Sequence, residues 1–263
     1  MPETLVSEKN PLMKEVRRAI ARGSLTGNGF AVAEGFHLLE EALRSRCEIA
    51  AAIAVSGVQD DLLARLPKTT RVIEVSERIF KTVASTETPQ GVVALIRPPA
   101  WTLDQLISHR SLIVILDGIQ DPGNAGSIVR AAEAFRASGV VFLKGSVNPY
   151  NPKALRASAG SIFRLPVVAG MEAGPLASEL MRTGIRIYSA LPRAERTIAA
   201  VDLKERCAIA IGAEGHGVGE ILRRAATGAR IPTCGVESLN AAVAAGILLY
   251  EASRQREAFH EPL

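Results

Sequence analysis

The spacing of apolar residues predicts a mixture of helices and strands in the first hundred residues. Leu12, Val16 and Ile20 recur at helical spacing and predict a helix over residues 11–22. Short apolar runs predict strands over 49–55, 71–75 and 91–96. The sequence Arg97-Pro98-Pro99-Ala100 then interrupts any regular element, because proline lacks the N–H and restricts the residue before it. We therefore predict a linker here and a domain boundary near residue 105.

Beyond this linker, apolar runs alternate with helical stretches. The runs cover residues 112–116, 140–143, 186–190 and 207–211. Strands that read as nearly continuous apolar runs between helices are typical of a parallel sheet covered on both faces. The sequence therefore predicts a smaller N-terminal domain over 1–105 and an α/β domain with a mostly parallel sheet over 106–263.

The composition of the chain is that of a soluble globular protein. Of its 263 residues, 48% are hydrophobic and 22% are charged. The N-terminal residues lack the apolar core of a signal peptide, and the longest apolar run, 241–250, is shorter than the roughly 18 residues of a membrane span. The cysteines are widely spaced and form no CxxC pair, which argues against disulfides and zinc and favours the reducing cytoplasm: Cys47, Cys207 and Cys234.

The net charge of +4 is unevenly distributed. Residues 1–105 carry equal numbers of basic and acidic side chains, whereas residues 130–164 contain a single acid, Glu133. The basic residues of that stretch are Arg130, Arg136, Lys144, Lys153, Arg156 and Arg164. Such a local excess of positive charge is typical of a surface that meets a polyanion.

The first segment with candidate chemistry follows the strand predicted over 112–116. Gly123 and Gly126 allow close approach of the backbone, and Asn124 can both donate and accept hydrogen bonds. We predict a helix over 127–137, with Arg130 on its outward side. An ordinary turn explains the same residues equally well, with Asn124 as a helix cap and Arg130 paired with Glu133.

The second segment follows the strand predicted over 207–211. Its glycines, at 212, 215, 217 and 219, free the backbone to present N–H and C=O groups to a ligand, and Glu214 adds a carboxylate. A phosphate-binding loop is disfavoured because no Gly-Lys-Ser/Thr sequence is present. His216 lacks companions at metal-ligand spacing, so we interpret it as a turn residue.

The third segment, 231–240, precedes a helix predicted from residue 241 on the helical spacing of Leu239, Val243, Ile247 and Tyr250. Ser238 and Asn240 provide hydrogen-bonding groups at the start of this helix. A helix N-terminus is a favourable place to hold a polar ligand, although Ser238 also suits a simple cap.

The order of the three segments resembles the SpoU/TrmH family of RNA ribose 2′-O-methyltransferases, which belongs to the SPOUT superfamily. Asn124-x-Gly126-x-x-x-Arg130 is similar to the first family motif, 209–217 to the second and 231–251 to the third. The N-terminal domain is similar to the RNA substrate-binding domain often fused to this enzyme, a smaller α/β fold related to ribosomal proteins. That similarity lies in Asn10-Pro11, Glu34-Gly35 and 86–91.

The resemblance implies a trefoil-knotted methyltransferase domain that forms a homodimer, uses S-adenosylmethionine and needs no metal. It implies catalytic roles for Asn124, Arg130, Glu214, Ser238 and Asn240. It implies cofactor binding by Gly212, Ala213, Glu214, Gly215, Ile231, Thr233, Ser238, Leu239 and Asn240, and RNA binding by Arg130, Lys153, Arg156 and Ser158. The chain departs from the family pattern at Arg136 and Thr233, where glycine and methionine are expected, and at Ala241-Ala242, where Val-Ser is common.

The chemistry of the implied reaction agrees with these residues. A ribose hydroxyl is a poor nucleophile, so methyl transfer needs positive charge near the developing alkoxide. Arg130 supplies such a charge and is too basic to act readily as the proton acceptor. We rank an RNA 2′-O-methyltransferase first, with rRNA favoured over tRNA. The alternatives are a non-catalytic RNA-binding protein that keeps the fold and a methyltransferase for a small molecule.

Overall fold

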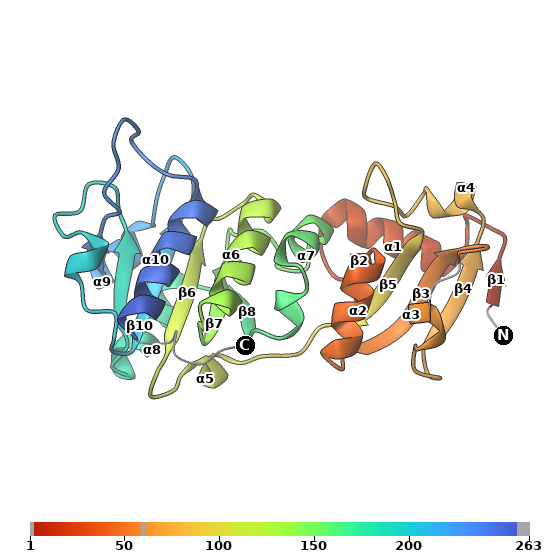
Figure 1. Ribbon diagram of the computed structural model, residues 1–263, viewed down its shortest axis with the longest axis horizontal. Helices are drawn as coiled ribbons and strands as arrows, with labels where there is room; N and C mark the ends of the chain where they lie inside the picture. The colour runs from red at the N-terminus through yellow and green to blue at the C-terminus, as the bar shows by residue number, and fades with distance from the viewer. Residues whose placement is uncertain (1–2, 59–60, 257–263) are drawn as a thin grey trace. The chain divides into compact units, whose positions relative to one another are not determined.

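The computed structural model describes residues 3–58 and 61–256, which form two compact units (Figure 1). The first unit comprises Met1–Ala100 together with Tyr150–Arg164, and the second comprises Trp101–Pro149 and Leu165–Leu263. The division at residue 100 lies close to the boundary expected from the sequence. The segment 150–164 was expected in the second domain, and its contacts group it with the first unit.

The first unit contains a mixed five-stranded sheet in the order β1-β4-β3-β5-β2. Strands β1, β4 and β3 are parallel to one another, whereas β5 runs antiparallel to both β3 and β2. The elements are β1 (Glu3–Leu5), α1 (Pro11–Arg22), β2 (Ala31–Glu34), α2 (Phe36–Arg44), β3 (Glu48–Val55), α3 (Asp61–Ala64), β4 (Arg71–Val75), α4 (Glu77–Phe80), β5 (Val92–Arg97), α7 (Pro152–Ser158) and η1 (Ser161–Phe163).

Helix α1 illustrates how local signals define an element in this unit. The Asn10 side chain accepts a hydrogen bond from the Leu12 N–H, and Pro11 occupies the first turn, where its missing N–H costs nothing. The helix ends at Gly23, whose φ of 58° is left-handed and suits glycine. Its buried side, which includes Met13 and Val16, packs against strand residues on one face of the sheet.

The second unit contains a six-stranded sheet in the order β11-β9-β10-β6-β7-β8, in which every pairing is parallel. The elements are α5 (Leu103–Leu106), β6 (Leu112–Asp117), α6 (Pro122–Ala134), β7 (Gly139–Leu143), β8 (Val167–Met171), α8 (Ala173–Arg182), β9 (Arg186–Ala190), η2 (Ile198–Ala200), β10 (Cys207–Gly212), α9 (Glu220–Ala225), β11 (Thr227–Ala229) and α10 (Ala241–Gln255).

Helices cover both faces of this sheet, as the apolar runs predicted. Ile113 and Ile115 of β6 share one core cluster with Leu176 of α8 and Leu222 of α9. Because side chains alternate along a strand, the equally buried Val114 faces the opposite side. Helices α6 and α10 lie side by side on the sheet (Figure 1). The predicted α/β fold is confirmed, whereas the trefoil knot stays a prediction.

The helix expected over 127–137 is shifted toward the N-terminus in the structure. Helix α6 begins at Pro122 and ends at Ala134, and its cap is Asp121, whose Oδ1 accepts a hydrogen bond from the Asn124 N–H at 2.7 Å. The interpretation of Asn124 as the cap was therefore wrong. The Asp-Pro pair is the stronger start signal, because proline is well tolerated in a first helical turn. Asn124 is thereby left free to use its side chain elsewhere.

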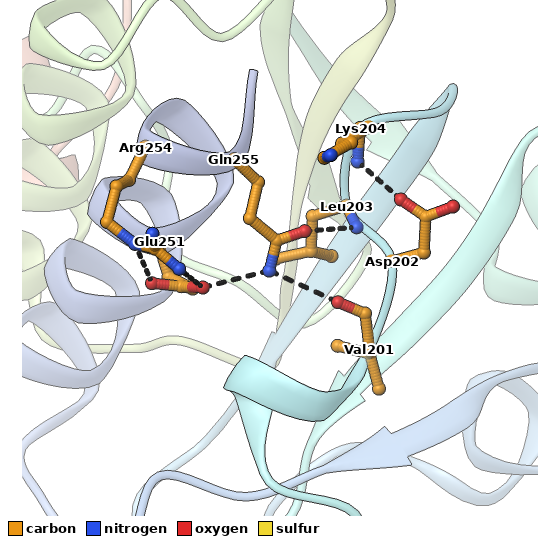
Figure 2. A network of polar contacts seen from close by, with 7 residues as sticks. All are labelled: Val201, Asp202, Leu203, Lys204, Glu251, Arg254 and Gln255. Atoms are coloured by element: carbon orange, nitrogen blue, oxygen red, sulfur yellow. Dashed lines mark hydrogen bonds and ion pairs between the residues drawn. The ribbon is translucent and has the colours of Figure 1, made fainter. Parts of the chain in front are cut away.

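The end of α10 is tied to the segment before β10 by a polar network (Figure 2). The Gln255 amide donates to Val201 O at 3.2 Å and accepts from Leu203 N–H at 2.8 Å, and it also contacts Glu251. Arg256 donates to the carbonyl oxygens of four residues: Leu203, Arg110, Ser111 and Glu205. These contacts fix the last turn of α10 on the sheet.

Across the described residues, no helix combines the length and the apolar character of a membrane span.

Candidate active site

The turns that carry the candidate site residues after β6 and β10 both leave the sheet at the carboxyl ends of its strands. Strands β6 and β10 are neighbours, and their last residues, Asp117 and Gly212, are directly paired. Since parallel strands place their carboxyl ends together, the turns after β6 and β10 begin side by side. The sequence predicted these as two separate segments, and the strand order makes them one site.

The glycine-rich turn after β10 folds back tightly on itself. The Gly217 N–H donates to Ala213 O at 2.8 Å. A Cβ on Gly212 would lie 1.9 Å from the Gly217 carbonyl carbon, so no larger residue fits there without rearrangement. By contrast, nothing lies within 4 Å of a Cβ added to Gly215 or Gly217. The turn is therefore closed at its base and open at its tip, where its backbone faces solvent.

Asp117 is a site residue that the sequence reading did not single out. Its Oδ2 accepts a hydrogen bond from the Gly219 N–H at 2.7 Å, and a Cβ on Gly219 would lie 3.0 Å from this same oxygen. Asp117 thus anchors the end of the glycine-rich turn to β6. An acidic residue directly after a buried apolar strand was the available signal, since such a carboxylate needs a nearby donor.

Three residues from the three segments form the centre of the site. The Asn124 amide donates to Glu214 Oε1 at 2.9 Å. The Asn240 amide donates to Asn124 Oδ1 and to Glu214 Oε1, each at 3.0 Å. These hydrogen bonds join side chains that are separated by 90 and by 116 positions in the sequence. This convergence of Asn124, Glu214 and Asn240, which we call the amide–carboxylate triad, fixes the Glu214 carboxylate beside the start of α10.

Asn240 also caps α10. Its Oδ1 accepts from the backbone N–H groups of Ala242 and Val243, at 2.9 and 3.2 Å, while its amide nitrogen serves the triad. One side chain therefore couples the start of the helix to the carboxylate of the glycine-rich turn. Both functions need an amide, because the oxygen must accept while the nitrogen donates.

The remaining predicted residues of the third segment lie in the loop before α10. Thr233 and Ser238 are exposed, whereas Ile231 and Leu239 are half-buried. The Thr233 hydroxyl donates to Val236 O at 3.2 Å. Gly235 has a left-handed φ of 76° and open space around it. The loop thus offers exposed polar groups beside the triad.

Arg130 stands on α6 between one and two turns after Asn124, and its side chain is exposed. The core side of the helix carries Ala125, Ile128 and Val129, which are fully buried. Arg130 therefore presents its charge to solvent from the helix that begins at the site, in agreement with the outward direction predicted from the sequence.

The residues expected to bind RNA in segment 150–164 differ in their surroundings. Lys153 is exposed. The Arg156 guanidinium donates to Ser85 Oγ at 2.7 Å and lies 3.8 Å from the buried Glu34 carboxylate. Ser158 is fully buried, and its hydroxyl donates to Leu155 O at 2.8 Å. Arg156 and Ser158 therefore have partners inside the first unit, and Lys153 is the exposed residue of the three.

Comparison with known proteins places these features in a family. The model of the SpoU rRNA methylase family matches residues 111–250, and that of the MRM3-like substrate binding domain matches residues 10–94. This chain belongs to the SpoU rRNA methylase family. The first match spans the three segments of the site, and the second covers most of the sheet of the first unit, from β2 into β5. The predicted resemblance is confirmed for both parts of the chain.

Individual members of the SpoU family are similar over nearly the whole chain. The 23S rRNA (guanosine(2553)-2′-O)-methyltransferase RlmP of Bacillus subtilis is 31% identical over 93% of this chain and 96% of its own. A crystal structure of an RNA 2′-O ribose methyltransferase has a TM-score of 0.82 at 32% identity, covering 97% and 99% of the two chains. AviRb of Streptomyces viridochromogenes in complex with AdoMet has a TM-score of 0.85 at 26% identity, covering 95% and 99%.

S-adenosylmethionine is the cofactor of this SpoU methyltransferase, and the residues at the site fit it. A large cofactor with amino acid, sulfonium and adenosine parts needs exposed backbone groups and a few fixed polar side chains. Exposed backbone groups are present at the open tip around Gly215 and Gly217 and in the loop before α10. The triad provides the fixed polar side chains. Within residues 3–58 and 61–256 no group of His, Cys, Asp and Glu is arranged to hold a metal.

Proposed function

We propose that this protein transfers the methyl group of S-adenosylmethionine to a ribose 2′-hydroxyl of ribosomal RNA. The observation that carries the proposal is the amide–carboxylate triad, which joins the three family segments at one edge of the sheet. Relatives named for 23S rRNA 2′-O-methylation support ribosomal RNA as the substrate class. We place the reaction in the cytoplasm, where ribosomal RNA and the cofactor are both present.

Within this reaction we assign charge stabilisation to Arg130. The cofactor supplies an electrophilic methyl group on a positively charged sulfur. The ribose oxygen must gain negative charge as it attacks, and a fixed guanidinium lowers the energy of that charge. Arg130 is exposed on α6, so a sugar of a bound RNA can reach it. Asn124 and Glu214 hold the adjoining turn in place.

We assign cofactor binding to the turn after β10 and the loop before α10. Gly212, Ala213, Glu214 and Gly215 contribute the backbone and carboxylate of the turn, and Ile231, Thr233, Ser238, Leu239 and Asn240 contribute the loop and the helix start. The open space around Gly215 and the exposure of Ser238 support this assignment. Lys153 and Arg130 remain our candidates for contacts with RNA phosphates.

We further propose that the protein is a homodimer through α10. Val243, Ile247 and Tyr250 are exposed by 52%, 37% and 48% and lie on one side of this helix. The Tyr250 ring meets Phe135 edge-on with centroids 6.0 Å apart, which extends the apolar surface to the end of α6. An exposed apolar stripe of this kind on two neighbouring helices is typical of an interface. Sedimentation as a monomer at micromolar concentration would refute this.

The decisive experiment maps 2′-O-methyl groups in total RNA from cells with and without the gene. Loss of one methylated ribosomal position is the expected result, whereas loss of a tRNA position would correct the substrate class. A substrate RNA with a 2′-deoxy nucleotide at the mapped position should bind and accept no methyl group. Methylation of that RNA would show that the enzyme methylates a base and not the ribose hydroxyl.

The Arg130→Ala variant tests the assigned role. Calorimetry should show unchanged binding of S-adenosylmethionine, while methyl transfer falls by roughly 10²–10⁴, the range for one positioned activating group. The Arg136→Ala variant is the matched control, because it removes an exposed cation beyond the end of the same helix. Retained activity in Arg130→Ala removes Arg130 from the mechanism.

A further inference from the structure

Helix α1 of the first unit presents a row of positive charge. Lys14, Arg18 and Arg22 follow one another at intervals of four residues, and all three are exposed. With a rise of 1.5 Å per residue, neighbouring cations lie about 6 Å apart along the helix axis. Met13 and Val16, on the other side of the helix, are fully buried. We call Lys14, Arg18 and Arg22 the α1 stripe.

The α1 stripe borders a hollow of about 480 Å³ between the helix and the turn that follows it. Its lining also includes Pro11, Leu25, Thr26 and Gly27, and none of the described residues that line it is aromatic. The one acid in the wall, Glu15, already accepts hydrogen bonds from the backbone and side-chain nitrogens of Asn28, at 3.3 and 3.1 Å. The hollow therefore offers positive charge without a ring on which a base would stack.

Among the described residues, the side chains of these three cations make no hydrogen bond. Arg17, on the neighbouring side of α1, is different, because it donates to Thr82 Oγ1 at 3.0 Å and to Glu8 O at 2.8 Å. In the part of the chain that the structure describes, no ion pair involves the α1 stripe. The first turn of α1 also lacks an acid, so the positive end of the helix dipole adds to Lys14.

Arg22 is not needed to close the helix either. The Gly23 and Ser24 N–H groups donate to Ile20 O and Ala19 O, at 3.0 and 3.1 Å, and so satisfy the terminal carbonyls. Residues 1–105 as a whole balance their acids and bases, yet α1 gathers four bases against one acid, Glu15. Arg17 is held within the unit, whereas the three cations of the α1 stripe have no hydrogen-bond or ion-pair partner among the described residues, and this points to an anionic partner.

We propose that the α1 stripe binds consecutive phosphates of the RNA substrate. The inference rests on the proposed function and adds a docking surface outside the catalytic unit. Lysine and arginine side chains on a helix contact phosphates without reading bases, and they position the RNA. The absence of aromatic residues from the lining agrees with backbone recognition, since single-stranded base recognition uses stacking platforms.

The test compares two triple variants of the full-length protein. Fluorescence anisotropy with a labelled RNA stem-loop is measured over a series of salt concentrations. In Lys14→Ala/Arg18→Ala/Arg22→Ala the slope of log K against log salt should fall by about one unit per lost phosphate contact, to a total of two or three. The control, with alanine at Arg65, Lys68 and Arg78, loses the same charge at exposed positions elsewhere in the unit. It should keep the parental slope.

The outcomes separate this surface from the proposed reaction. An unchanged slope in the α1 variant overturns the inference and leaves an acidic protein surface as the partner of the α1 stripe. An equal loss in the control variant also overturns it, because net charge alone then explains binding. Unaltered thermal melting and S-adenosylmethionine binding show that the variants are folded. If the parent methylates no RNA at all, the proposed function fails, whereas the anisotropy result still decides whether α1 binds RNA.

Discussion

Replacing Asn240 by aspartate separates its two roles in the site. Aspartate is as good a helix cap as asparagine, so its oxygen continues to accept from Ala242 and Val243 and α10 keeps its start. The amide nitrogen, however, is lost. Its two hydrogen bonds, to Asn124 Oδ1 and Glu214 Oε1, are replaced by oxygen facing oxygen at a distance of 3.0 Å in the parent.

The expected cost follows from these contacts. Losing one hydrogen bond to a neutral oxygen and one to a carboxylate costs about 1 and 1.5 kcal/mol. Two carboxylates about 3 Å apart at an exposed site repel by roughly 1–1.5 kcal/mol, and salt reduces this. Rotation of the exposed side chains relieves part of the sum, which leaves about 2–4 kcal/mol. If the reaction requires the intact triad, methyl transfer falls roughly 30- to 1000-fold.

Single-turnover methyl transfer to RNA measures this effect, with thermal melting as the measure of folding. Asn240→Ser is the matched control, because serine keeps a capping oxygen without adding charge, and it should lose less activity. Combining Asn240→Asp with Glu214→Gln restores a donor opposite an acceptor and should recover part of the lost rate. Parental activity in Asn240→Asp would refute the requirement for the triad.

Four further substitutions test the fold of the second unit. Arg136→Gly should stabilise the protein by about 1 kcal/mol in urea unfolding, because the φ of 57° at this helix end favours glycine; no gain would contradict this account. Gly212→Ala should abolish cofactor binding in calorimetry, since its Cβ would lie 1.9 Å from the carbonyl carbon of Gly217. Arg256→Ala should lower the free energy of unfolding by roughly 1–3 kcal/mol, because it removes the hydrogen bonds that tie the end of α10 to four carbonyl oxygens, including that of the buried Leu203. Arg254→Ala removes an ion pair with the largely buried Glu251 carboxylate, which keeps its hydrogen bond from Gln255, and should cost about 1 kcal/mol.

The sequence alone determined the elements that have strong local signals. The helix over 11–22 and the strands over 71–75 and 186–190 have the predicted bounds, because apolar periodicity, an asparagine cap and a terminal glycine each act within a few residues. The start of α6 was misplaced for the same kind of reason. The Asp121-Pro122 start signal lies earlier than the apolar periodicity on which the prediction relied.

At Arg136 the sequence shows a departure from the family pattern but not the physical reason for it. It was noted as a departure from an expected glycine, and the structure supplies the reason, since the position after the end of α6 has a left-handed backbone. An isolated sequence cannot reveal φ. Once the helix end is placed, the preference for glycine follows from the crowding of Cβ in that conformation.

The site itself was decided by the tertiary structure. The sequence identified Asn124, Glu214 and Asn240 as three separate polar residues, and their order pointed to a family. Only the pairing of β6 with β10, and the packing of α10 against α6, brings the three amide and carboxylate groups within 3.0 Å of one another. The same fold gives Asp117 a role and places Ser158 inside the first unit. Periodicity depends on near neighbours in the chain, whereas a site assembled across 116 residues depends on strand order, which near neighbours do not specify.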